Sequence, residues 1–201
     1  MLNFRKINFQ KYNRIWEVLQ NEKRKKPIYQ TFNTYGSLHD EIKKRTNIVP
    51  RSNEDLFKII LLIHKWGGVT GRYFLMNKKT GSHFEEFKKD KKQIDIYKQA
   101  ANLAIEGNPA AFDLFCNIKG IGAAFASKHA YLWSTKRKPL IIIDKLIANF
   151  FGFNKPEILL KEMGSYTKLY ELFKSESKSL GLKSILILER GIFQYVRENK
   201  V

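Results

Sequence analysis

The segment NIKGIGAAFASKHAYLW, at residues 117–133, combines residue types that can bind an anion. Gly120 and Gly122 allow the backbone to turn sharply and to approach a phosphate, while Ile121 between them can anchor the turn in a core. The following residues are apolar in a helical pattern, so the free N–H groups at that helix's N-terminus face the same anion. Lys119 adds a positive charge beside them. The spacing predicts two helices joined by a tight turn that contacts DNA phosphates through residues 119–122 and Ala124; the alternative is a turn that only ends the first helix.

Two reactive side chains follow this turn. Lys128 lies on the predicted second helix, and Asp144 comes after the apolar, β-branched stretch LIII, where the next helical pattern begins. An aspartate at such a position is commonly an N-cap and nothing more. Asp144 is, however, the only carboxylate between Asp113 and Glu157. Its isolation beside the hairpin favours a chemical role.

On these residues the chain resembles the helix-hairpin-helix superfamily of DNA glycosylases, and in detail its prokaryotic 8-oxoguanine DNA glycosylase-like branch. The segments IKGIGAAFASKHAYLW and KPLIIIDKLIANFFG carry the resemblance, which covers about residues 118–152. It implies an all-α, two-lobed domain over residues 1–201, with the hairpin and catalytic segment at 112–152. It also implies that double-stranded DNA is bound between the lobes and that a damaged or modified base is flipped out and excised. The branch favours an oxidised purine such as 8-oxoguanine.

The resemblance assigns roles to the two reactive side chains. Asp144 matches the aspartate that faces the sugar and stabilises the positive charge that develops as the base leaves. Members with lyase activity commonly place their nucleophilic lysine where this chain has Ala124. Lys128 stands one helical turn further on, about 6 Å along the axis and on the same face, and a long side chain can reach back over Ala124. We expect Lys128 to attack the sugar as a free amine whose pKa is lowered by burial. The alternatives are a phosphate contact, with water as the nucleophile, and a solvated surface lysine.

Aromatic and basic residues gather in a second segment, HKWGGVTGRYF. We expect Arg72 to contact DNA, and Trp66, Tyr73 and Phe74 to line a base pocket, although aromatic side chains are more often packed in a core. From the C-terminal helical pattern, Phe193 or Tyr195 is expected to contribute to a pocket.

The composition fits a nucleic-acid partner and no cofactor. Lys and Arg number 37 against 19 Asp and Glu, a net charge of +18 that attracts polyanions, unless it reflects only a Lys-rich surface. Cys116 is the single cysteine, and the four histidines show no metal-ligand spacing, so we expect no metal or cofactor. His129 is expected to face the cleft edge or the solvent.

Apolar residues recur at helical spacing along most of the chain, for example at 53–66, 94–105 and 182–196. No apolar run is long enough for a membrane span, and the N-terminus lacks a signal core, so a cytoplasmic, nucleoid-associated protein with no indicated protein partner is expected. Two functions compete with the favoured one. They are a non-catalytic helix-hairpin-helix DNA-binding protein, and a glycosylase of the same fold that acts on an alkylated or phage-modified base.

Overall fold

A computed structural model describes residues 4, 7–22, 34–67, 72–75 and 82–199, without the side chains of Arg72 and Tyr73. Within these ranges the chain forms α-helices and no β-strand, so the predicted all-α class is confirmed. No helix in the described ranges has the length and apolar character needed to cross a membrane. The helices are α1 (Phe9–Asn21), α2 (Tyr35–Arg45), α3 (Asn53–Trp66), α4 (Arg72–Leu75), α5 (His83–Lys89), α6 (Lys91–Ile105), α7 (Ala111–Cys116), α8 (Ala123–Trp133), α9 (Lys145–Phe150), α10 (Pro156–Met163), α11 (Tyr166–Ser179) and α12 (Ile185–Asn199).

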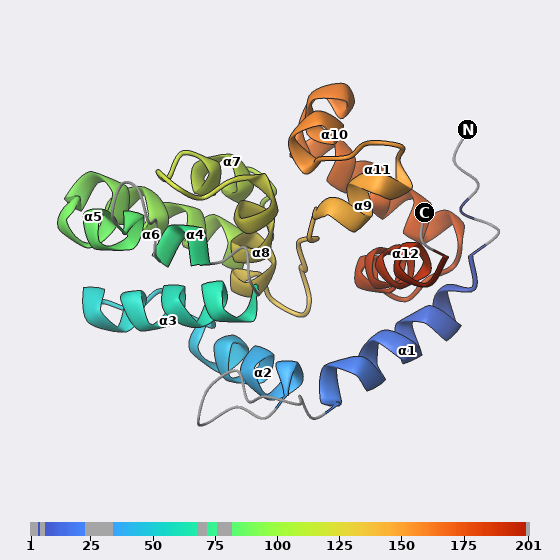
Figure 1. Cartoon of the computed structure of the whole chain (residues 1–201), viewed down its shortest axis with the longest axis horizontal. Coiled ribbons are helices and arrows are strands. Elements are labelled where there is room, and N and C mark those ends of the chain that lie inside the picture. Colours follow the sequence, from blue (N-terminus) through green and yellow to red (C-terminus); the bar gives the residue numbers. More distant parts are fainter. Residues whose placement is uncertain (1–3, 5–6, 23–33, 68–71, 76–81, 200–201) are drawn as a thin grey trace.

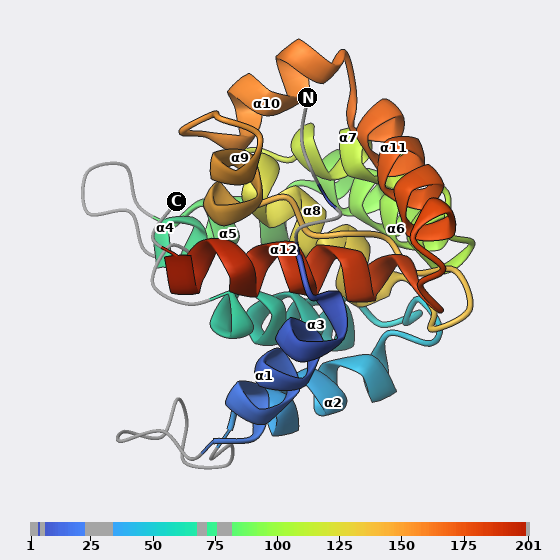
Figure 2. The same cartoon turned by 90° about the vertical axis from the view of Figure 1, so that its right-hand side faces the viewer.

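The helices form two groups, joined by the segment 134–144 (Figure 1). In one group α8 packs against α6 and α7, and α3 packs against α2. The other group contains α9 to α12, and α1 joins it by packing on α12, as both views show (Figures 1 and 2). The first and last helices of the chain are therefore neighbours. Helix α1 also contacts α2, so it links the two groups.

Capping residues set the helix boundaries. Helix α3 occupies the predicted residues 53–66, because Ser52 Oγ accepts hydrogen bonds of 3.1 and 3.4 Å from the backbone of the first turn. Helix α6 contains the predicted residues 94–105 but begins at Lys91, since Asp90 Oδ1 accepts a 3.1 Å bond from the backbone of its first turn. Side-chain caps thus decide where an apolar pattern becomes a helix.

Helix α8 is apolar around most of its circumference and lies in the core. His129 is fully buried there: its Nδ1 lies 2.7 Å from Tyr97 Oη and its Nε2 lies 3.1 Å from His64 Nε2. Burial lowers the pKa of His129 well below its usual range. The expectation that His129 faces the cleft edge or the solvent is wrong, because α3 and α6 cover the face of α8 that carries it. These polar contacts fix the orientation of α8 and of Lys128 on it.

Candidate active site

The glycine turn lies between α7 and α8, as the sequence predicts. Gly120 has a φ of +87°, and Gly122 is the N-cap of α8, where its carbonyl oxygen accepts 2.9 Å bonds from the backbone of the first turn. Both glycines are exposed, whereas the side chain of Ile121 is buried, at 4% exposure. Ile121 therefore anchors the turn, and its side chain is not on the surface where the sequence places a DNA contact.

The hairpin lysine is exposed and already paired. Lys119 Nζ lies 2.9 Å from Glu86 Oε2, and its backbone N–H donates a 3.0 Å hydrogen bond to Gln93 Oε1. The Lys119 side chain is 71% exposed, so the pair is weak and a phosphate can replace the Glu86 carboxylate. Ala124, in the first turn of α8, is half-buried and does not line the cavity described below.

Replacing Gly120 with alanine is expected to destabilise the protein by more than the cost of a left-handed alanine, about 1 to 2 kcal/mol. A Cβ at Gly120 would lie 2.9 Å from the ring of His83. Gly152 is the matched control, because its φ is +84° and an added Cβ would meet nothing within 4 Å. Urea unfolding of Gly120→Ala and Gly152→Ala measures the difference in the free energy of unfolding. Equal losses would show that the His83 contact is unimportant.

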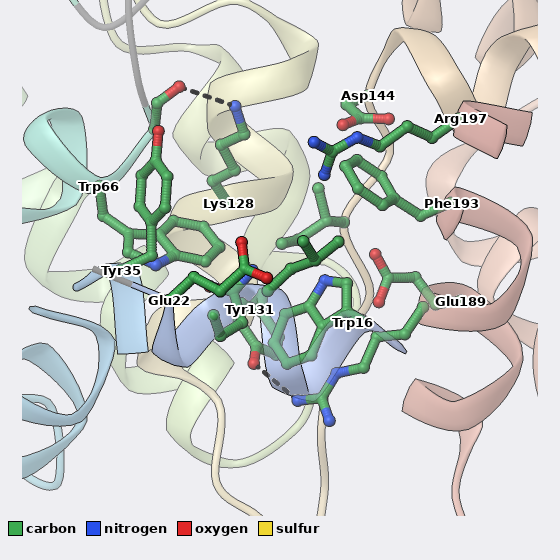
Figure 3. Close-up of a pocket in the computed structure, with 15 residues that line it drawn as sticks. Trp16, Glu22, Tyr35, Trp66, Lys128, Tyr131, Asp144, Glu189, Phe193 and Arg197 are labelled. Carbon is green, nitrogen blue, oxygen red and sulfur yellow. Dashed lines mark hydrogen bonds between the residues drawn. The ribbon is translucent and has the colours of Figure 1, made fainter. Parts of the chain in front are cut away.

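A cavity of about 650 Å³ lies between the two groups of helices and contains both predicted catalytic side chains (Figure 3). Its walls come from α1, α2, α3, α8 and α12, and from the segment that ends at Asp144. The lining residues are Trp16, Leu19, Gln20, Glu22, Tyr35, Trp66, Gly67, Lys128, Tyr131, Ile142, Asp144, Glu189, Arg190, Phe193 and Arg197. Lys128 and Asp144 of the sequence motif therefore line a pocket whose other walls come from helices distant in sequence, such as α1 and α12.

Lys128 is held at the cavity wall by two contacts. Its Nζ donates a 3.3 Å hydrogen bond to the carbonyl oxygen of Gly67 and lies 4.6 Å from the centre of the Phe125 ring. Burial lowers the pKa of Lys128, and the charge of Asp144 opposes that shift. The structure therefore contradicts the solvated surface lysine that the sequence left open. The Lys128 amine is partly desolvated and electrostatically coupled to a carboxylate.

Asp144 is both a helix cap and a residue of the cavity wall. As the N-cap of α9, its Oδ1 accepts hydrogen bonds of 2.9 Å from Leu146 N and 3.1 Å from Ile147 N. Burial raises the pKa of Asp144, while the backbone N–H groups and the charge of Lys128 act in the opposite direction. Since Asp144 also lines the cavity, capping and a role in chemistry do not exclude each other.

The segment before Asp144 is attached to α8 and α11. Ser127 Oγ accepts a 2.9 Å bond from Ile143 N, and Tyr166 Oη donates to Ile141 O at 2.7 Å. Ser127 directly precedes Lys128 in α8. The hydrogen bond from Ile143 therefore fixes the backbone of Asp144 relative to the backbone of Lys128.

The predicted base-pocket aromatics divide into three cases. Trp66 lines the cavity, and its buried Nε1 has no hydrogen-bond partner among the described residues. Phe74 was wrongly assigned to the pocket: it is 1% exposed and stacks on His64 with 4.5 Å between ring centres. It packs in the core because α4 presents it to α3 and α5. The side chains of Arg72 and Tyr73 lie outside the described residues.

Of the two C-terminal aromatic residues expected near a pocket, Phe193 lines the cavity, whereas Tyr195 packs edge-on against Tyr12.

Three other lining residues, Trp16, Tyr131 and Glu189, were not predicted from the sequence. Glu189 carried a signal, since it is an acid inside the apolar run LILERGIF. Trp16 had none, because it lies in α1 and reaches the cavity only through the packing of α1 on α12, and Tyr131 looked like one more apolar residue of α8.

Tyr131 is the centre of a polar network below the cavity. Its Oη lies 2.9 Å from His39 Nε2 and accepts a 3.2 Å bond from Arg190 Nη2. Lys43 Nζ donates 2.7 Å bonds to the carbonyl oxygens of Tyr131 and Ser134. Burial, with the nearby charges of Arg190 and Lys136, lowers the pKa of Lys43 to about 7. The network ties α2 and α8 to α12 across the floor of the cavity.

In its described ranges the chain is thus a helical protein with a lysine and a carboxylate on the wall of one pocket. Comparison with protein-family models, with curated proteins and with solved structures gives no match to the chain. The function is therefore inferred from the residues and their geometry.

Proposed function

We propose that this protein is a DNA glycosylase with AP lyase activity that flips out and excises a damaged or modified base. The observation that carries the proposal is the position of Lys128 and Asp144 on one cavity, with their charges coupled. The turn at Gly120 and Gly122 precedes the helix that bears Lys128, as expected of a helix-hairpin-helix element. The two groups of helices would be the two lobes, with the duplex bound across the opening between them.

The cavity has the size and the walls that an extruded base requires. Its volume of about 650 Å³ falls within the range of small-molecule sites. Trp16, Trp66, Tyr131 and Phe193 supply aromatic surface, on which the flat face of a base can stack. The unpartnered Nε1–H of Trp66 is a donor for a carbonyl or ring nitrogen of the base. An oxidised purine such as 8-oxoguanine is the favoured substrate, on the strength of the resemblance.

In the proposed reaction, Asp144 acts on the sugar and Lys128 attacks it. The Asp144 carboxylate stabilises the positive charge that develops on the sugar as the bond to the base lengthens. Burial lowers the pKa of Lys128 and so favours its neutral amine, the form that attacks the anomeric carbon. The resulting Schiff base permits cleavage of the DNA backbone.

Borohydride trapping on a duplex that carries 8-oxoguanine opposite cytosine tests the proposal. A covalent complex with this duplex, and none with the undamaged duplex, would support a glycosylase that uses an amine. Base release without a trapped complex would leave a glycosylase that uses water. If both are absent, while duplexes with alkylated or phage-modified bases react, the substrate preference is wrong. If no modified base is released although the duplex is bound, the result would favour a non-catalytic helix-hairpin-helix DNA-binding protein.

Affinity for duplex DNA is expected to fall steeply as salt rises, because a chain with a net charge of +18 releases counterions when it neutralises phosphates. The logarithm of the binding constant should decrease with the logarithm of salt concentration by about 0.9 per phosphate contact. Lys119→Gln should reduce this slope by about one, as removal of one contact requires. Fluorescence anisotropy at several salt concentrations measures the slope. A flat dependence would contradict a phosphate-contacting surface.

A further inference from the structure

Glu189 is a second buried carboxyl of the cavity, and the proposed mechanism leaves it unused. The residue lies in α12 and is only 5% exposed. It lines the same cavity as Lys128 and Asp144, and its carboxyl points toward the interior of that cavity (Figure 3). Burial of a carboxyl is costly unless it is paired or protonated. Its presence in the pocket therefore needs a physical reason.

The cation beside Glu189 has other partners. Arg190 Nη2 donates to Tyr131 Oη at 3.2 Å, and the guanidinium carbon lies 4.0 Å from the centre of the Trp16 ring. Within the part of the chain that the structure describes, no residue forms a hydrogen bond or an ion pair with the Glu189 carboxyl. The carboxyl is therefore available to a ligand in the cavity.

Burial favours the protonated form of Glu189. Burial raises the pKa of Glu189 to about 8, and the charge of Asp144 adds to the effect of burial, while Arg190 opposes it. The other titratable groups that interact with it or share the cavity are Tyr131 in α8, Tyr166 in α11, Glu22 after α1, Tyr35 in α2, Lys128 in α8 and Arg197 in α12. Its surroundings therefore favour a protonated Glu189 carboxyl at neutral pH.

The two buried carboxyls of the cavity have different surroundings. Asp144 accepts two backbone N–H groups and feels the charge of Lys128, and both favour its ionised form. Glu189 accepts no backbone N–H group, and the charge of Arg190 offsets only part of the effect of its burial. Two carboxyls whose surroundings separate their protonation states are suited to divide acid and charge-stabilising roles, as in other glycosidic cleavages.

We propose that Glu189 is the general acid that protonates the base as it leaves. The inference rests on the proposed glycosylase function and adds a third catalytic residue to it.

In the proposed step the O–H bond of Glu189 breaks, and its proton passes to a nitrogen or oxygen of the base. The glycosidic C–N bond breaks, and its electron pair leaves with the base, which departs neutral. The lone pair of the neutral Lys128 amine forms the new bond to the anomeric carbon. The products are a Glu189 carboxylate, a neutral base and a cationic aminal, so the charge balances.

Glu189→Gln tests the proposal, because glutamine keeps the size and a hydrogen-bond donor but cannot transfer a proton. The substrate is the duplex that the wild-type protein processes fastest in a panel with oxidised or alkylated purines. We expect single-turnover base release to slow by about 100-fold or more, the usual contribution of general acid catalysis. Glu198→Gln is the matched control, since it makes the same change at an exposed position of α12 and should keep the wild-type rate.

The pH profile gives a readout that a merely structural role would not move. Base release by the wild type should fall as pH rises through about 8, because Glu189 then loses the proton it donates. Deprotonation of Lys128 has the opposite effect on the rate of base release, since the neutral amine, which is the nucleophile, becomes more abundant as pH rises. Glu189→Gln should lose the alkaline decline and keep the rise due to Lys128.

A duplex with a preformed abasic site separates the possible failures. No base has to leave this DNA, so Glu189→Gln should form the borohydride-trapped complex at the wild-type rate. An equal loss on damaged and abasic DNA would mean that Glu189 supports the site structurally, and would overturn the inference. A wild-type rate of base release by Glu189→Gln would overturn it while the glycosylase stands. Failure of the wild-type protein on the whole panel and on abasic DNA would instead overturn the proposed function.

Discussion

Lys128→Gln is expected to abolish the borohydride-trapped complex with damaged DNA and to change affinity for the duplex by less than about tenfold. Among the described residues, Lys128 is the only lysine that lines the cavity. Its amine is held against Gly67 and the Phe125 ring, at one end of the pocket that would hold the sugar and the base. Glutamine keeps most of the side-chain volume but supplies no amine for a Schiff base.

The dependence of trapping on pH provides a second readout for Lys128. Burial lowers the pKa of Lys128 from the ordinary lysine value of 10.5. The trapping rate should rise with pH as the amine loses its proton, and should level off at a lower pH than an exposed lysine would give. Lys178→Gln, which removes one charge from an exposed position of α11, should leave trapping unchanged. A complex that persists in Lys128→Gln would mean that another amine attacks the sugar.

Local sequence signals predicted the elements that carry the motif. The apolar periodicity over residues 53–66 gave the bounds of α3, and the glycines at 120 and 122 gave the turn between α7 and α8. The stretch before Asp144 was expected to deliver that residue to the start of a helix, and it does. Each of these features depends on residues close in sequence, so capping and turn rules are sufficient.

The remainder of the pocket depends on contacts between distant segments. Trp16 in α1 and Glu189 in α12 meet at the cavity because the first and last helices pack together. Periodicity assigns each of them to a helix face but does not say which other helix covers that face. Phe74 shows that local sequence can also assign a core residue to a binding site by mistake. Its neighbours in sequence suggested a binding loop, whereas its partners in space, His64 and Phe84, make it part of the core.

Asp144→Asn is expected to reduce base release by at least about 100- to 1,000-fold, the usual effect of losing one group that stabilises a charged transition state. The asparagine Oδ1 can accept the same two bonds from Leu146 N and Ile147 N, and asparagine is as good an N-cap as aspartate. The free energy of unfolding should therefore change by less than about 1 kcal/mol. DNA affinity, measured by anisotropy, should be close to that of the wild type.

Two further variants separate capping from chemistry at Asp144. Asp90→Asn makes the same change at the N-cap of α6 and should keep wild-type activity, because Asp90 does not line the cavity with Lys128. Asp144→Ala removes both capping bonds and should lower the free energy of unfolding by about 1 kcal/mol in addition to abolishing base release. If Asp144→Asn retained activity while Asp144→Ala lost it, the carboxylate would act only as a cap. Loss of activity in Asp144→Asn at unchanged stability would place the effect in the carboxylate group, its negative charge and its second acceptor oxygen, since the shape of the side chain and its backbone contacts are preserved.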